Sequence, residues 1–195
     1  MGVLVLTRHL AEDAIDLNRA EELLREVPPY VGRYAVTHAL ELSELRKVAA
    51  LPIDTLQLHD AVAPEVAARL ADEHPELRLI KALPIIGSQP PSISPWPSTV
   101  DAILLDSADP SSGRIGGTGQ THDWAVSAEV AGRVKLPVIL AGGLRPDNVA
   151  TAVEQVRPWG VNVNSGVELE DGAKSVDLVR EFVAAANEAQ LVARR

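Results

Sequence analysis

The chain has 195 residues and a formal net charge of −9, carried by 27 acidic and 18 basic residues. That charge disfavours a nucleic-acid partner, because a negative surface repels a phosphate backbone. The sequence contains no cysteine, which excludes disulfides, thiolate metal ligands and a thiol nucleophile. Hydrophobic residues make up 46% but aromatic residues only 3%. We therefore expect aliphatic side chains to fill the core of a single domain over residues 1–195.

The apolar runs are all too short to cross a membrane. The first residues, MGVLVLTRH, lack the basic region and the cleavage site of an export signal. We therefore expect a cytoplasmic protein that has no membrane partner.

Short β-rich segments alternate with amphipathic segments along the chain. In chain order, the apolar runs predict strands at residues 3–7, 33–38, 55–59, 78–84, 102–107, 137–142 and 160–166. Apolar residues at helical spacing predict helices at residues 18–27, 42–51, 63–74, 124–134, 145–156 and 175–189. Within the fifth helix, Pro146 or Asp147 marks the expected start. The segment 85–99, rich in proline and serine, is predicted to be a loop.

This alternation predicts right-handed βαβ units and a parallel sheet. A closed (β/α)8 barrel and an open doubly wound sheet both fit it. The first strand lacks a following glycine-rich turn, which disfavours a dinucleotide-binding sheet. Glycines gather instead after the late strands, where barrels commonly bind phosphate. We therefore predict an α/β fold of the TIM-barrel kind, with seven recognisable strands.

Several segments of the second half form a specific combination. These are DAILLDS (101–107), GGTGQTHDW (116–124), PVILAGGLRPDNVATAV (137–153) and GVNVNSGVELEDGAKS (160–175), preceded by TLQLHD (55–60) and LIKALPI (79–85). In this order they resemble the phosphoribosylanthranilate isomerase family, (β/α)8 enzymes of tryptophan biosynthesis. The resemblance implies an isomerase that acts on a phosphorylated sugar derivative such as N-(5′-phosphoribosyl)anthranilate, by an Amadori rearrangement and with no cofactor.

The chain also departs from the family pattern. The family opens with a strand that ends in a Lys-Ile-Cys-Gly-type motif, whose cysteine is the general base, whereas MGVLVLTRH resembles the second strand. The first β/α unit is therefore predicted to be missing, which accounts for the count of seven. The alternative is a mis-set start codon that discarded the first strand. Because an open barrel leaves two unpaired edges, we expect a homodimer or an irregular segment that fills the gap. Asn162 stands where the family has aspartate, and His122 where it has phenylalanine.

Asp106 ends the fifth predicted strand, and the functional face of a parallel barrel lies at such ends. The resemblance assigns Asp106 the role of the general acid that protonates the sugar ring oxygen. A carboxyl in a partly dry site can have its pKa raised enough for this role. The alternative is an aspartate that only caps the next turn.

Glycine pairs after two late strands can direct backbone N–H groups toward an anion. The resemblance places the phosphate site at five residues, which are Gly142, Gly143, Asn164, Ser165 and Gly166. Glycines that serve only tight turns are the alternative. The loop IGGTGQ (115–120), with Gly117, Thr118 and Gly119, is expected to close over substrate, or to be a surface loop with no role. Arg8 is a candidate for the anthranilate carboxylate, and otherwise a solvated side chain.

Three histidines, His9, His38 and His59, fall at or just beyond strand ends. One of them could replace the missing cysteine as base, since imidazole titrates near neutral pH. Together with Asp106 or Asp60 they could instead hold a divalent metal, or they could simply pack and hydrogen-bond. We predict no metal site. A non-catalytic phosphosugar-binding protein and a metal-dependent epimerase or lyase remain alternative functions.

Overall fold

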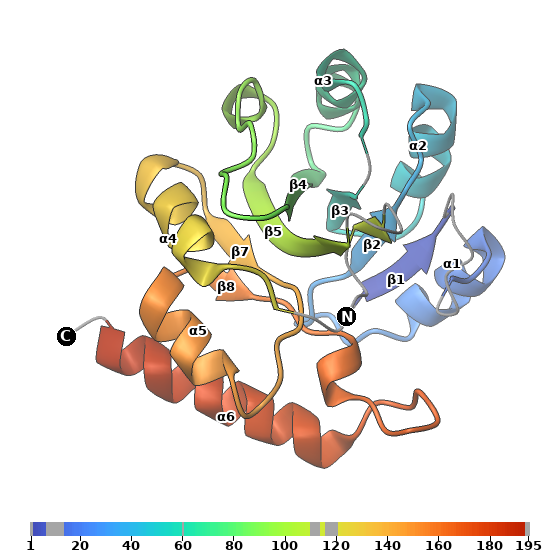
Figure 1. Cartoon of the computed structure of the whole chain (residues 1–195). Coiled ribbons are helices and arrows are strands. Elements are labelled where there is room, and N and C mark those ends of the chain that lie inside the picture. The colour runs from blue at the N-terminus through green and yellow to red at the C-terminus, as the bar shows by residue number, and fades with distance from the viewer. Residues whose placement is uncertain (1, 7–13, 60, 110–113, 116–120, 194–195) are drawn as a thin grey trace. The chain divides into compact units, whose positions relative to one another are not determined.

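The computed structural model describes residues 2–6, 14–59, 61–109, 114–115 and 121–193. Strands and helices alternate along the chain (Figure 1). In order, they are β1 (Gly2–Val5), α1 (Leu17–Arg25), β2 (Tyr34–Thr37), α2 (Leu42–Ala49), β3 (Thr55–Leu58), α3 (Pro64–Glu73), β4 (Arg78–Ile85), η1 (Trp96–Ser98), β5 (Ala102–Asp109), β6 (Arg114–Ile115), α4 (Trp124–Arg133), β7 (Val138–Leu140), α5 (Val149–Val156), β8 (Gly160–Val161), η2 (Ser165–Val167) and α6 (Val176–Ala193).

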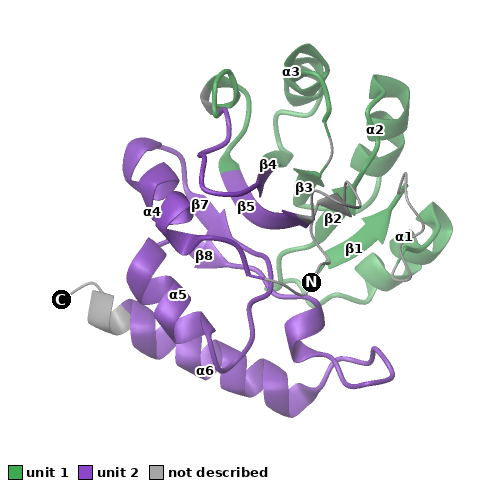
Figure 2. Ribbon diagram, viewed as in Figure 1, with its two compact units in different colours: residues 1–82, 93–102 green, residues 83–92, 103–195 purple. Residues whose placement is uncertain are grey.

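The chain forms two compact units, coloured separately in Figure 2. Unit 1 consists of residues 1–82 and 93–102, and unit 2 of residues 83–92 and 103–195. Both units are discontinuous in sequence, because residues 83–92, which begin within β4, belong to unit 2 and residues 93–102 belong to unit 1. The single domain over residues 1–195 stays a prediction.

In unit 1, β1 to β4 pair in chain order and in parallel. One row of the register joins Val3, Ala35, Leu56 and Leu79, and each of these side chains is buried. Such a row is what short aliphatic strands form when both faces of a parallel sheet are covered. The helices α2 and α3 lie side by side in this unit (Figure 1).

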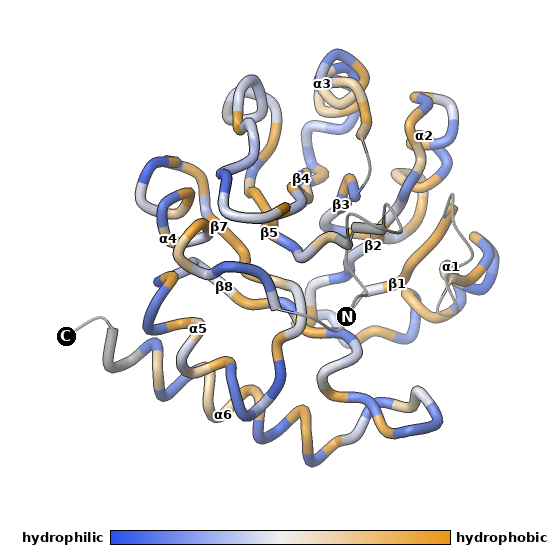
Figure 3. Tube along the Cα trace, in the orientation of Figure 1, coloured by the Kyte–Doolittle hydropathy of each residue, from blue (hydrophilic) through white to orange (hydrophobic). Residues whose placement is uncertain are grey.

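In unit 2, β5 pairs with β7 and β7 with β8, all in parallel, while the two-residue β6 runs antiparallel to β5. The helices pack in succession, α4 on α5 and α5 on α6. Figure 3 shows β7 as a hydrophobic segment and α6 as an alternation of hydrophobic and hydrophilic residues. The amphipathic α6 buries Phe182 and Ala189.

All seven predicted strands are present in the described residues, whereas β6, η1 and η2 were not predicted. The last predicted strand, 160–166, was too long. It ends at Val161 because Asn164, at φ −123° and ψ −86°, leaves the extended conformation and η2 follows. The start of α5 was also predicted too early. The carbonyl of Arg145 accepts from the N–H groups of Asn148 and Val149, so a turn occupies the positions before the helix.

No helix in the described part of the chain combines the length and the hydropathy that a bilayer-spanning segment needs.

Candidate active site

Asp106 lies near the carboxyl end of β5 with only 8% of its surface exposed. Its neighbours Leu104 and Leu105, and Leu140 on the paired strand β7, are fully buried. Burial raises the pKa of the Asp106 carboxyl to about 6, although Ser107 opposes this by donating its N–H to Oδ1 at 2.8 Å. A carboxyl with this pKa can hold a proton near neutral pH and give it up, which is what a general acid does.

The turn after β7 packs directly against the residue that follows Asp106. Gly142 and Gly143 have φ values of +84° and +61°, a backbone conformation that favours glycine. A Cβ on Gly142 would lie 2.6 Å from the backbone nitrogen of Ser107 and 2.8 Å from its Oγ. The first glycine is therefore needed both for its conformation and for the close approach of the two strand ends.

Asn148 braces the same turn. Its Nδ2 donates to the carbonyl of Gly143 at 3.0 Å, and its Oδ1 accepts from the N–H of Arg145 at 2.8 Å. These bonds engage the carbonyl side of the turn. The sequence analysis did not single out Asn148, although an asparagine just before a helix is a common N-cap signal.

The segment after β8 packs on the residue that follows the two glycines. A Cβ on Gly166 would lie 1.8 Å from the carbonyl oxygen of Leu144, so no other residue fits there without a shift of the backbone. The contacts thus run from Ser107 to Gly142 and from Leu144 to Gly166. Within unit 2 they bring the ends of β5, β7 and β8 together, with the acid at one end of the series.

His122 precedes α4, whose N-cap Asp123 accepts from the N–H of Ala125 at 2.9 Å. The His122 Nε2 lies 2.6 Å from Oγ of the buried Ser127. In the described part of the chain its buried Nδ1 has no hydrogen-bond partner. Burial lowers the pKa of His122 to about 4, despite the opposing effect of Asp123. This imidazole is therefore neutral at physiological pH.

In unit 1, His38 and His59 lie together, with ring centroids 5.1 Å apart and ring planes tilted by 37°. His59 is buried, and the side-chain amide of Gln57 donates to its Nδ1 at 3.0 Å. Because Nδ1 accepts in this arrangement, the ring proton of His59 resides on Nε2.

Lys81, which the sequence analysis did not single out, is a buried lysine on β4. Its Nζ donates to the carbonyls of Ala82 at 2.6 Å and Leu58 at 3.3 Å, and lies 5.4 Å from the ring centroid of Trp96. Carbonyl and aromatic contacts of this kind offset the cost of removing an ammonium group from water.

Several predicted site residues lie outside the described residues. They are Arg8, His9, Asp60, Gly117, Thr118 and Gly119. Among the residues that are described, no group of three or more histidine, aspartate or glutamate side chains could hold a metal ion.

The family model described as N-(5'phosphoribosyl)anthranilate (PRA) isomerase matches residues 6–185. The chain belongs to this family. The isomerase family was predicted from the motifs around Asp106 and the late glycines, and the match confirms it. It also confirms the predicted isomerase class.

Relatives in this isomerase family cover nearly the whole chain. N-(5'-phosphoribosyl)anthranilate isomerase 2 of Methanosarcina mazei is 35% identical over 188 residues, which is 94% of this chain and 82% of the relative. The isomerase of Haloferax volcanii is 41% identical over 183 residues, or 90% of this chain and 77% of the relative.

Solved structures of phosphoribosylanthranilate isomerases agree with the fold. The enzyme from Thermotoga maritima superposes with a TM-score of 0.78 at 29% identity, covering 96% of this chain and 87% of that one. The Pyrococcus furiosus enzyme gives 0.74 at 28% identity, with the same coverage. The TIM-barrel-like α/β fold class is therefore confirmed.

Asp106 and His122 predict opposite effects of pH on stability. The folded state binds the Asp106 proton more tightly than the unfolded state does. The free energy of unfolding that this group contributes is therefore lost as pH rises from about 4 to 6. His122 binds its proton more weakly in the folded state than in the unfolded state. The free energy of unfolding that it contributes is therefore lost as pH falls from about 6.5 to 4. Relative to the parent chain, Asp106→Asn should gain about 2 kcal/mol of unfolding free energy between pH 4.5 and 7.5.

Urea denaturation at the two pH values measures this gain, and Asp177→Asn, which alters a highly exposed carboxylate, is the control. An Asp106→Asn variant whose stability follows that of the parent chain at both pH values would contradict a raised pKa.

Proposed function

We propose that the chain catalyses the isomerisation of N-(5′-phosphoribosyl)anthranilate, with Asp106 as general acid. The observation that carries the proposal is the buried carboxyl of Asp106, with a pKa of about 6, which lies next to the glycine turn after β7. The curated relatives and the solved structures carry the name of this reaction. One solved relative is described in complex with a reduced deoxyribulose 5-phosphate derivative.

The proposed reaction begins when Asp106 gives its proton to the ring oxygen of the sugar. The bond between that oxygen and C1′ breaks as the nitrogen lone pair forms a C=N bond, which yields an open-chain Schiff base. A base then removes the proton from C2′, and the resulting enolamine tautomerises to the ketose. Burial supports the first step, because it keeps Asp106 protonated over part of the neutral range.

For the phosphate group we propose the five residues Gly142, Gly143, Asn164, Ser165 and Gly166. With a net charge of −9, the chain as a whole does not attract a dianion. Attraction must then come from local donors, and backbone N–H groups in glycine turns supply them. The left-handed conformations of both glycines and the contact of Gly166 with Leu144 support this assignment.

Asp106→Asn tests the acid. The amide keeps the size of the carboxyl but cannot transfer the proton, so kcat/KM should fall by about two to four orders of magnitude. In the parent chain, kcat/KM should also fall as pH rises above about 6, because the acid ionises. Loss of substrate fluorescence measures the rate. Asp177→Asn is the matched control, and an Asp106→Asn variant with parental rates would contradict the assignment.

The general-base cysteine that the family resemblance implies is not among the residues of this sequence. We propose that His38 takes this role, supported by its contact with the buried ring of His59. His38→Gln should lower kcat by about two orders of magnitude or more. His59→Gln should affect kcat less than His38→Gln does.

Steady-state kinetics of both variants measures the difference, with His74→Gln at the end of α3 as the control. Equal and small effects at both positions would exclude His38 and His59 as the base. Binding of substrate without turnover in the parent chain would favour the non-catalytic phosphosugar-binding protein.

One solved structure concerns monomers made from the dimeric Thermotoga maritima enzyme. That relative's assembly supports our proposal of a homodimer for this chain. Three valines of α6, Val176, Val179 and Val183, are exposed at helical spacing and form an apolar stripe that a second copy could cover. The homodimer and the cytoplasmic location both stay predictions.

A further inference from the structure

The segment between η2 and α6 folds back on itself. The N–H of Leu169 donates to the carbonyl of Ala173 at 2.8 Å, and the N–H of Ser175 to that of Val167 at 2.9 Å. Glu168 and Lys174 face each other as an antiparallel bridge. These backbone bonds give the segment its shape without the aid of the Lys174 side chain.

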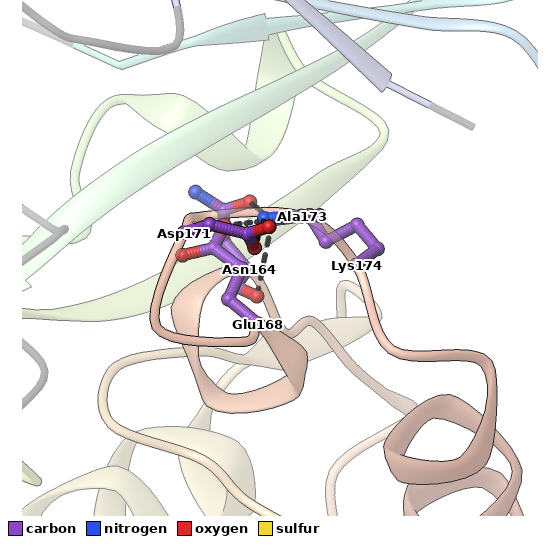
Figure 4. Close-up of polar contacts among 5 residues, drawn as sticks. All are labelled: Asn164, Glu168, Asp171, Ala173 and Lys174. Atoms are coloured by element: carbon purple, nitrogen blue, oxygen red, sulfur yellow. Dashed lines mark hydrogen bonds and ion pairs between the residues drawn. The ribbon is translucent and has the colours of Figure 1, made fainter.

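The Lys174 ammonium group reaches back ten residues to Asn164, one of the five residues proposed for phosphate. Its Nζ donates to Asn164 Oδ1 at 2.6 Å, to the Asn164 carbonyl oxygen at 3.2 Å and to a carboxylate oxygen of Glu168. Figure 4 shows the three side chains gathered at one point of the segment. An ammonium group has three donors, and here each has an acceptor.

These contacts fix the direction of two donors at Asn164. With Oδ1 turned toward Lys174, the Nδ2 of the same planar amide points away from it, as Figure 4 shows. A trans peptide directs its N–H opposite to its C=O, so the carbonyl held by Lys174 also directs the N–H of Ser165 away. Lys174 therefore orients an amide NH2 group and a backbone N–H away from itself.

The charge of Lys174 should contribute less to phosphate binding than the hydrogen bonds by which it orients Asn164. Glu168 lies against the ammonium group and its side chain is only 19% exposed, so the pair has little net charge. The Lys174 side chain is itself 48% exposed, and water screens what remains. A direct electrostatic pull on a dianion is therefore the smaller effect.

We propose that Lys174 is a positioning residue for the phosphate subsite, acting through Asn164 and Ser165. This inference rests on the proposed function, because it assigns the oriented donors to the phosphate of that substrate. The ligand of this subsite is a phosphate monoester dianion, which accepts hydrogen bonds from fixed N–H groups. Lys174 does not contact the reacting atoms, and its effect should therefore appear in binding rather than in the chemical step.

The experiment compares Lys174→Met with the parent chain and uses inorganic phosphate as the probe. Calorimetry should show the Kd for inorganic phosphate rising about tenfold, the effect of misaligning one or two hydrogen bonds to a charged ligand. The KM for the phosphorylated substrate should rise by a similar factor, while kcat stays within about threefold. Lys174→Arg keeps a cation with several donors and should recover most of the phosphate affinity.

Lys135→Met is the matched control, because Lys135 is an exposed lysine between α4 and β7 and its replacement changes the net charge equally. Its phosphate affinity should equal that of the parent chain. Parental phosphate affinity in Lys174→Met, or a fall in kcat with KM unchanged, would overturn the inference. A parent chain that fails to bind phosphate would overturn it too. Phosphate binding without turnover would sink the proposed function but leave the Lys174 comparison valid.

Discussion

Gly142 approaches the backbone of Ser107 so closely that a methyl group would have no room between them. This contact holds the end of β7 against the end of β5, directly after the buried Asp106. Burial then raises the pKa of Asp106, and the same turn supplies the glycine amides proposed for phosphate. The position of Asp106 and the shape of the turn proposed to bind the anion thus have a common structural origin.

The electrostatics of unit 2 are local rather than global. A chain with a net charge of −9 gains nothing from its overall field when the ligand is an anion. Fixed donors can bind such a ligand, because their dipoles are already aligned when it arrives. The neutralised pair of Lys174 and Glu168 fits this pattern, since it orients donors without adding net charge. His122, kept neutral by burial next to Ser127, likewise adds no positive charge.

Much of the fold could be predicted because the sequence pattern is local. Aliphatic runs such as residues 102–107 and the helical spacing of Leu42, Leu45 and Val48 report burial within one element, and the structure contains both elements. The contacts that shape the site are of another kind. The close approach of Gly166 to Leu144 joins residues 22 apart in the chain, and the bond from Lys174 to Asn164 spans ten. No periodicity encodes such distant pairs, which explains why Lys174 was missed. Asn148 bonds residues only three and five positions away, so its N-cap signal was available in the sequence, whereas the two-residue β6 is too short to show a pattern.

Asp106 should bind its proton unusually tightly, and NMR titration of its side-chain carboxyl carbon measures this most directly. The Asp106→Asn variant identifies the resonance by its disappearance. We expect a midpoint at about pH 6, well above that of an ordinary aspartate. A midpoint at pH 4 or below would show that the carboxyl is ionised throughout the neutral range, and that it cannot serve as the acid of this reaction.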